Sequence, residues 1–349
     1  MITLYEKLDN KNINSEVIEK AAGILQKGGL VAFPTETVYG LGANGLDSEA
    51  CRKIYEAKGR PSDNPLILHI GDISQLETIV SDVPKAAEKI INAFWPGPVT
   101  IIFNKKDIVP DSVSGGLNTV AVRFPSDEIA KRLIVSSGLP IAAPSANTSG
   151  KPSPTKAEHV LHDMDGRIDM IIDGGSCGFG LESTIIDVTG DKPALLRPGA
   201  VTKEMLEAVV GDIDVDSAVY KQLSKDEKPK APGMKYTHYS PEADVALVRG
   251  ESNEKVIAKI NSLVLSDKMA GFKTGVLCCG KNADKYAADI VLSAGDDIET
   301  VGARLFDILR RFDLLGAEKV YSEVFDEAGE GMAVMNRLKK AAGHKFIEA

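Results

Sequence analysis

The spacing of apolar residues along the chain predicts alternating helices and strands from residue 14 to residue 210. One helix is expected over 15–27 and a second over 47–58, and each is followed by glycine, which commonly ends a helix. Short runs rich in β-branched residues predict strands over 30–35, 66–71, 99–104, 120–124, 140–143, 170–173, 184–188 and 194–197. This alternation predicts one large α/β domain over residues 1–210.

The pattern changes over residues 211–241, where the apolar periodicity fades into an acidic and lysine-rich run. The run ends in Pro232-Gly-Met-Lys-Tyr-Thr-His-Tyr-Ser-Pro241, and we expect an interdomain linker here. Alternation resumes over residues 242–349, with strands expected at 244–248, 274–278, 290–292 and 319–322 and helices near 253–265, 298–315 and 332–342. This predicts a small Rossmann-like domain with a parallel sheet. Because no Gly-x-Gly-x-x-Gly fingerprint opens it, a lid, regulatory or docking role is favoured over dinucleotide binding.

Composition narrows the class of protein. The chain has 349 residues, of which 43% are apolar and 26% charged, enough to bury a sizeable core in two domains. Neither a targeting signal nor a run of about 20 apolar residues is recognisable, and the four cysteines stand in unrelated contexts, so we expect a cytoplasmic protein with no membrane association. The net charge of -9 argues against nucleic-acid binding over the whole surface, although a local basic site is compatible with it.

Polar residues gather at the ends of several predicted strands. In Phe33-Pro-Thr-Glu-Thr-Val-Tyr-Gly-Leu-Gly42 a buried strand gives way to hydroxyls, a carboxylate and glycines, which is typical of a ligand site, although an ordinary turn accounts for it about as well. In Lys58-Gly-Arg-Pro-Ser-Asp-Asn-Pro-Leu-Ile-Leu-His69 the cations Lys58 and Arg60 could bind phosphates, or could simply complement a helix C-terminus. His69 could equally be a core histidine.

Further candidate segments follow in the same half of the chain. The loop Ala143-Pro-Ser-Ala-Asn-Thr-Ser-Gly150 can bond phosphate or sugar oxygens, and the glycine-rich run 173–184 offers backbone amides to an anion; ordinary turns explain both. Arg123 and Arg197 each stand at a strand end, where arginines are often merely solvated. The sequence contains no Walker-type phosphate loop, no histidines at metal spacing and no Gly-x-Ser-x-Gly elbow. ATP would therefore bind without a P-loop.

Taken together and in order, these motifs resemble the YrdC-like family of threonylcarbamoyl-AMP synthases. The likeness rests on Pro-Thr-Glu-Thr-Val-Tyr-Gly, Lys-x-Arg-Pro-x-x-x-Pro-Leu-x-x-His, Phe94-Trp-Pro-Gly-Pro-Val-Thr100, Ala-Pro-Ser-Ala-Asn and Leu-Glu-Ser-Thr-Ile. Residues 232–241 and the domain after them resemble the long, two-domain form. The resemblance implies a large twisted mixed sheet with helices around a positively charged cavity, followed by the smaller Rossmann-like domain.

The resemblance also implies an activity. Members of the family condense L-threonine, bicarbonate or CO2, and ATP into L-threonylcarbamoyl-AMP, with Mg²⁺ and release of pyrophosphate, and so act as nucleotidyltransferases. The product serves threonylcarbamoyladenosine formation beside the tRNA anticodon and passes to a tRNA threonylcarbamoyltransferase complex. Two other readings remain open: another carbamoyl-adenylate-handling enzyme, or an RNA-binding module with weak RNA binding.

Carried over motif by motif, the resemblance implies binding residues for both substrates. Threonine is expected to contact Thr37, His69, Arg123, Ala143 and Ser183. ATP is expected to contact Arg60, Asn64, Thr119, Ser145, Ser153, Arg197 and Tyr236. The expected catalytic residues are Lys58, beside the phosphates, and Arg60. Mg²⁺ is expected on the ATP phosphates rather than on protein side chains.

The chemistry explains why these residue types are needed. A carbamate decomposes readily in water and must attack the α-phosphorus as pyrophosphate departs, so exclusion of water and charge neutralisation are the main demands. Lys58, Arg60 and Arg197, with Mg²⁺, are expected to offset the charge on the triphosphate. We further hypothesise that the linker residues Lys235, Tyr236 and His238 form a lid over the site.

Overall fold

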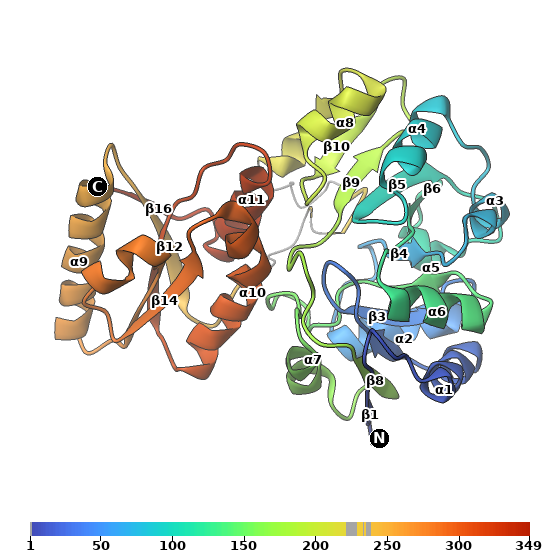
Figure 1. Cartoon of the computed structure of the whole chain (residues 1–349), viewed down its shortest axis with the longest axis horizontal. Coiled ribbons are helices and arrows are strands. Elements are labelled where there is room, and N and C mark those ends of the chain that lie inside the picture. The colour runs from blue at the N-terminus through green and yellow to red at the C-terminus, as the bar shows by residue number, and fades with distance from the viewer. Residues whose placement is uncertain (1, 221–228, 233, 235–238) are drawn as a thin grey trace. The chain divides into compact units, whose positions relative to one another are not determined.

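The structure is a computed structural model that describes residues 2–220, 229–232, 234 and 239–349 (Figure 1). The chain divides into two compact units. The first contains residues 1–149 and 153–236, and the second contains residues 150–152 and 237–349. The early part of the expected linker, up to residue 236, thus belongs to the first unit.

The first unit is built on an eleven-stranded mixed sheet with the order β1-β8-β2-β3-β7-β4-β6-β5-β9-β10-β11. Its strands are β1 (Leu4–Lys7), β2 (Val31–Phe33), β3 (Gly40–Asn44), β4 (Ile67–His69), β5 (Val99–Asn104), β6 (Thr119–Arg123), β7 (Ile141–Ala142), β8 (Met170–Asp173), β9 (Thr184–Asp187), β10 (Ala194–Arg197) and β11 (Asp214–Val215). The sheet contains both parallel and antiparallel pairs, so the expected large mixed sheet is confirmed.

Helices connect these strands. They are α1 (Ser15–Gln26), α2 (Ser48–Lys58), α3 (Leu76–Ile79), α4 (Lys85–Phe94), α5 (Asp111–Ser114), α6 (Glu128–Ser137), α7 (Ala157–Met164) and α8 (Lys203–Val210). The side chain of Asp47 caps the N-terminus of α2, and Gly59 follows its C-terminus with φ 62°, a left-handed conformation that glycine adopts without a steric penalty. The turn at Gly59 directs the chain from Lys58 into the loop before β4.

Two apolar layers cover the sheet of the first unit. In one, α1 and α6 pack with strand residues that include Val31, Phe33 and Ile172. In the other, Ile67, Ile102 and Ile185 form a floor that is covered by residues from beyond the last strand: Ala218, Ala231 and Met234. Side chains alternate between the two faces of a strand. Residues two positions away from these isoleucines on each strand therefore lie on the same face of the sheet.

The second unit is a five-stranded, entirely parallel sheet with the order β14-β13-β15-β12-β16. Its elements are β12 (Asp244–Arg249), α9 (Asn253–Met269), β13 (Thr274–Cys279), β14 (Ile290–Gly295), α10 (Ile298–Leu314), β15 (Lys319–Glu323), α11 (Gly331–Ala341) and β16 (Phe346–Glu348). Helix α9 lies on one side of this sheet, and α10 and α11 lie on the other (Figure 1). The predicted small parallel domain is therefore confirmed.

The predicted strands all occur, but the sequence pattern missed others. The strand β3 has the sequence Gly-Leu-Gly-Ala-Asn, which lacks the β-branched residues that mark a strand. Gly42 has a packing reason, because a Cβ added there would lie 2.8 Å from the ring of Phe33. The strand β1 is mostly exposed and β11 and β16 are short, so none of them has a clear apolar pattern.

Within the part of the chain that the structure describes, no helix combines the length and the apolar character that crossing a bilayer requires. The cysteines Cys51, Cys177, Cys278 and Cys279 are all free thiols. Burial raises the pKa of the Cys51 and Cys278 thiols to about 12, so neither is expected to form a reactive thiolate near neutral pH.

Replacement of Phe33 tests the packing between β2 and β3. Phe33 is fully buried, and its ring meets the His69 ring edge-on with centroids 6.3 Å apart. We expect Phe33→Ala to lower the free energy of unfolding of the first unit by about 3–5 kcal/mol. The fluorescence of Trp95, the single tryptophan of the chain, reports this unfolding in denaturant. Val135→Ala, at a 58% exposed position on α6, should change it by less than about 0.5 kcal/mol; equal effects would contradict the assigned packing.

Candidate active site

One end of the second apolar floor is polar. His69 ends β4 and Arg123 ends β6, and the register of these parallel strands places the two residues side by side. Thr100, on β5, faces Arg123 across the next pair of strands. The Thr100 hydroxyl lies 2.7 Å from the Ser183 hydroxyl, just before β9. Neighbouring strands thus bring polar side chains together from four distant parts of the sequence.

Arg197, at the end of β10, extends this polar row. Its Nε donates to the backbone carbonyl of Ser183 at 3.0 Å, and its Nη2 donates to the Ser183 hydroxyl at 3.1 Å. Its Nη1 donates to the carbonyl of Pro232 at 3.3 Å. Arg197 therefore joins the sheet edge to the segment that follows the first unit's last strand.

The loop between β2 and β3 is attached to the same edge by an ion pair. The Oε1 atom of Glu36 lies 2.7 Å from Nη2 of Arg123, and the two side chains are 11% and 5% exposed. Thr37 is fully buried in this loop, with its hydroxyl 2.8 Å from that of Thr35. The ion pair thus attaches the residue before Thr37 to Arg123.

Ala143 lies beside the same strands. Its backbone N–H donates to the carbonyl of Ile67 at 2.9 Å, which places it next to β4, two residues before His69. The residues expected to contact threonine therefore come from the β2–β3 loop, β4, β6, the segment after β7 and the start of β9. Of these residues, His69 and Arg123 stand at the C-terminal ends of β4 and β6, whereas Ala143 lies beside Ile67 at the start of β4.

Several residues expected to contact ATP stand at the opposite ends of β4 and β6. Thr119 begins β6, four residues before Arg123, a separation of about 13 Å along a parallel strand. Arg60 donates from Nη2 to the carbonyls of Asn64 at 3.3 Å and Pro65 at 3.0 Å, just before β4. Asn64 is 2% exposed, and its Oδ1 accepts no hydrogen bond. Part of the expected nucleotide set is thus separated from the expected threonine set along the strands.

Lys58 is buried at the end of α2, and its ammonium lies against the loop that follows β7. Its Nζ donates to the carbonyl of Ser145 at 2.5 Å and also to the carbonyl of Asn147. The Ser145 hydroxyl in turn donates to Oδ1 of Asn147 at 2.6 Å. Lys58 therefore orders the loop that carries Ser145, a role that the sequence pattern did not indicate.

Ser153 and Tyr236 are the remaining residues expected around ATP, and the structure describes only the first of them. Ser153 is buried, and its hydroxyl donates to the carboxylate of Glu182. Tyr236 lies outside the described residues, as do Lys235 and His238 of the hypothesised lid. The described residues Ala231 and Met234 are buried over the apolar floor.

Burial and neighbouring charges set the protonation states at the edge. Burial, followed by the positive charge of Arg123, lowers the pKa of His69 to about 3, so His69 is neutral at physiological pH. Burial, and then the negative charge of Glu36, raises the pKa of Asp127 to about 6. Glu36 and Asp127 were not among the predicted site residues. Glu36 stands inside a recognised motif, whereas nothing in the local sequence distinguishes Asp127 from an ordinary helix cap.

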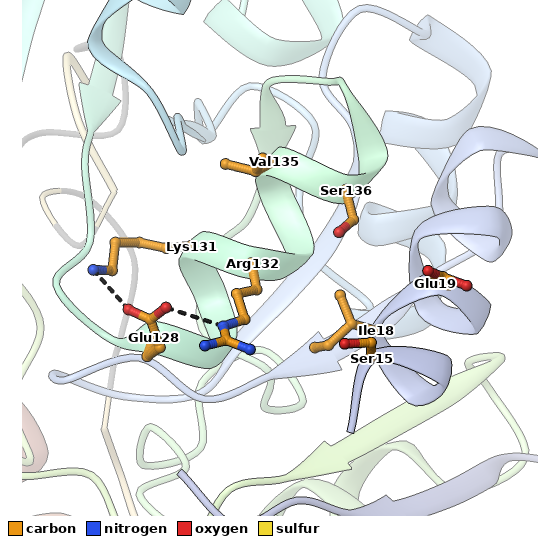
Figure 2. Close-up of a pocket in the computed structure, with 8 residues that line it drawn as sticks. All are labelled: Ser15, Ile18, Glu19, Glu128, Lys131, Arg132, Val135 and Ser136. Atoms are coloured by element: carbon orange, nitrogen blue, oxygen red, sulfur yellow. Dashed lines mark hydrogen bonds and ion pairs between the residues drawn. The ribbon is translucent and has the colours of Figure 1, made fainter. Parts of the chain in front are cut away.

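A surface pocket elsewhere in the first unit has a different character. It has a volume of about 280 Å³ and lies between α1 and α6 (Figure 2). Its principal charges are paired with each other, because Glu128 contacts both Lys131 at 2.8 Å and Arg132 at 3.0 Å. None of the predicted site residues lines it. Among the residues that the structure describes, no group of three or more histidine, cysteine or acidic side chains is arranged to hold a metal ion.

Comparison with known families matches two consecutive parts of the chain. Residues 23–199 match the Sua5–YciO–YrdC family model, which is described as telomere recombination. Residues 201–343 match the model described as the threonylcarbamoyl-AMP synthase C-terminal domain. Together the two models account for most of the chain.

Individual relatives match over nearly their whole length. The threonylcarbamoyl-AMP synthase of Bacillus subtilis is 51% identical over 342 residues, covering 97% of this chain and 96% of the relative. That of Pyrococcus abyssi is 50% identical over 331 residues, covering 95% of each chain. The crystal structure of P. abyssi Sua5 complexed with L-threonine superposes with a TM-score of 0.94 at 48% identity, covering all of both chains. Escherichia coli YciO matches 57% of this chain and 96% of its own, with a TM-score of 0.51 at 28% identity.

The pKa of His69 predicts a measurable pH dependence of stability. Because the folded-state pKa of about 3 lies below the ordinary value of 6.5, the unfolded chain binds the proton more strongly, and stability is lost as the pH falls below 6.5. From pH 7.5 to pH 5, we expect the wild-type protein to lose about 2 kcal/mol of unfolding free energy relative to His69→Gln. Asp127 contributes with the opposite sign, but equally in both proteins. Parallel pH profiles in denaturant titrations would contradict a neutral, buried His69.

Proposed function

The chain belongs to the threonylcarbamoyl-AMP synthase family, and we infer from this that it is an L-threonylcarbamoyladenylate synthase. It condenses L-threonine, bicarbonate or CO2, and ATP into L-threonylcarbamoyl-AMP, for threonylcarbamoyladenosine modification of tRNA. The observation that carries this conclusion is the near-complete match to a relative whose structure contains L-threonine. The release of pyrophosphate and the nucleotidyltransferase class follow from the chemistry of adenylate formation.

The arrangement of polar residues supports this reaction. At one end of β4 and β6, the guanidinium of Arg123 suits a carboxylate, and the neutral His69 and the Ser183 hydroxyl suit polar groups of threonine. At the other end, Arg60, Asn64 and Thr119 suit a nucleotide. We propose that threonine and ATP bind along this face, so that the carbamate formed on threonine meets the α-phosphorus between them. Holding both substrates in one orientation lowers the entropic part of the barrier.

Four cations surround the proposed reaction path, and each has a separate role in the proposal. Arg60 and Arg197 neutralise negative charge on the triphosphate, while Arg123 holds the substrate carboxylate. Lys58 acts beside the phosphates and through the loop that it orders, because its bonds to the carbonyls of Ser145 and Asn147 fix the position of the Ser145 hydroxyl. Mg²⁺ is proposed to enter as part of the ATP complex, where it would offset charge on the phosphates.

The segment after β11 is proposed as a lid. Burial of Ala231 and Met234 over the floor, with the bond from Arg197 to Pro232, anchors its start in the first unit. Residues 235, 236 and 238 would then exclude water while the carbamate is exposed. We also propose that the protein works in the cytoplasm and that its unstable product passes to a tRNA threonylcarbamoyltransferase complex. Weak RNA binding remains a second candidate function.

Pyrophosphate release tests the proposed function directly. With ATP, Mg²⁺ and bicarbonate, we expect release to depend on L-threonine and to be much slower with L-serine, L-valine or no amino acid, because the site must recognise both the hydroxyl and the methyl group. A coupled phosphate assay after pyrophosphatase treatment measures it. Release that is indifferent to threonine would overturn the proposal; tight, salt-sensitive binding of tRNA without turnover would favour the RNA-binding alternative.

Removal of the Lys58 ammonium tests its role in ordering the loop. Lys58→Met leaves the carbonyls of Ser145 and Asn147 without this donor, and the resulting displacement of Ser145 should lower kcat/KM for ATP by about a hundredfold. Arg52→Met is the matched control, because Arg52 is an exposed cation on the same helix and its guanidinium pairs with Glu49 and Glu56. Steady-state kinetics of both variants, with Trp95 fluorescence as a check of folding, decides the point. Equal activities would contradict the role given to Lys58.

A further inference from the structure

The ion pair between Glu36 and Arg123 is buried but incompletely satisfied. Its atoms lie 2.7 Å apart, yet the N–H of Arg123 is not directed at the carboxylate oxygen, so the contact is electrostatic and not a well-aligned hydrogen bond. Both carboxylate oxygens of Glu36 and both Nε and Nη2 of Arg123 are buried without a hydrogen-bond partner. A buried polar group left in this state destabilises the protein, because it has lost its hydrogen bonds to water. A ligand that supplies hydrogen-bond donors to Glu36 and acceptors to Arg123 would satisfy these atoms.

The chemistry of the two side chains defines that ligand. An ionised carboxylate only accepts hydrogen bonds, and a guanidinium only donates them. Glu36 therefore needs a group rich in N–H donors, preferably cationic, and Arg123 needs an acceptor, preferably anionic. A zwitterionic α-amino acid, which carries an ammonium and a carboxylate on the same carbon, supplies both groups in one small ligand.

The surrounding groups favour a cationic partner for Glu36. Asp127 adds a second carboxyl nearby, and the negative charge of Glu36 contributes to its raised pKa. His69 and Cys177 carry no compensating charge, because burial lowers the pKa of the imidazole and raises that of the thiol. When the carboxyls of Glu36 and Asp127 are both ionised, two negative charges face the single positive charge of Arg123. An ammonium bound at Glu36 would restore the balance.

We propose that Glu36 binds the α-ammonium of L-threonine while Arg123 binds its carboxylate, so that the two residues together recognise the zwitterion. This rests on the proposed function and adds a specificity-determining residue to it. Glu36 thereby holds the nitrogen that becomes the carbamate nitrogen at a fixed distance from the residue that holds the carboxylate. The loop between β2 and β3 is thus a part of the substrate site and more than a support for Thr37.

Calorimetric titration of the full-length protein with two ligands tests this. One is L-threonine, and the other is its analogue of the same stereochemistry with a hydroxyl in place of the amino group. We expect the wild-type protein to prefer threonine by about tenfold to a hundredfold, since hydrogen bonds to charged groups contribute about 1.5–3 kcal/mol. Glu36→Gln should lose this preference while binding the analogue as the wild-type protein does.

Further variants keep the outcomes distinct. Glu36→Asp retains the charge and should keep part of the preference, and Glu56→Gln, at an exposed position on α2, should leave it unchanged. If Glu36→Gln weakens both ligands equally, Glu36 only positions Arg123 and the proposal is wrong. If Glu36→Gln does not fold, an equal affinity of the wild-type protein for the two ligands would still overturn it. Failure of the wild-type protein to bind threonine at all would instead overturn the proposed function.

Discussion

The buried contact between Glu36 and Arg123 is the interaction on which the arrangement of the site depends. It joins the loop after β2 to the end of β6, although these segments are separated in the sheet by β3, β7 and β4. Two charges removed from water are stabilised only when each remains close to the other, so separating them would leave an uncompensated charge in the interior. The contact therefore restricts where the loop can lie, and with it the position of Thr37.

Several residues of the site make hydrogen bonds that hold the fold together, in addition to the substrate contacts proposed for them. Lys58 holds two carbonyls of the loop after β7, Arg197 holds Ser183 and Pro232, and Ser153 bonds to Glu182. A side chain fixed in this way meets a ligand without first losing its own conformational freedom, which is how preorganised sites lower the cost of binding. The same bonds mean that substitution of these residues changes the architecture together with the chemistry, so matched control variants are needed to separate the two effects.

The apolar floor beneath this polar edge has a complementary role. Along three strands an isoleucine and a polar residue lie two positions apart and hence on the same face; the pairs are Ile67 and His69, Ile102 and Thr100, and Ile185 and Ser183, the last of which stands just before β9. The same strands therefore supply an apolar surface and a polar edge. Charged groups interact more strongly beside such a surface than in water. The neutral state of His69 follows from the same environment, because burial and Arg123 both oppose its protonation.

Sequence alone determined the elements with strong local signals: the helices bounded by caps and glycines, the β-branched strands such as β5 and β8, the parallel character of the second unit, and the family with its motif residues. It missed β3, whose Gly42 is required by the ring of Phe33 from a neighbouring strand, and it did not indicate that Lys58 binds backbone carbonyls. The strand order, the Glu36–Arg123 contact and the raised pKa of Asp127 were decided only by the tertiary structure. The physical reason is that register, burial and charge proximity join residues far apart in the chain, and no local pattern encodes which distant strand or charge will become a neighbour.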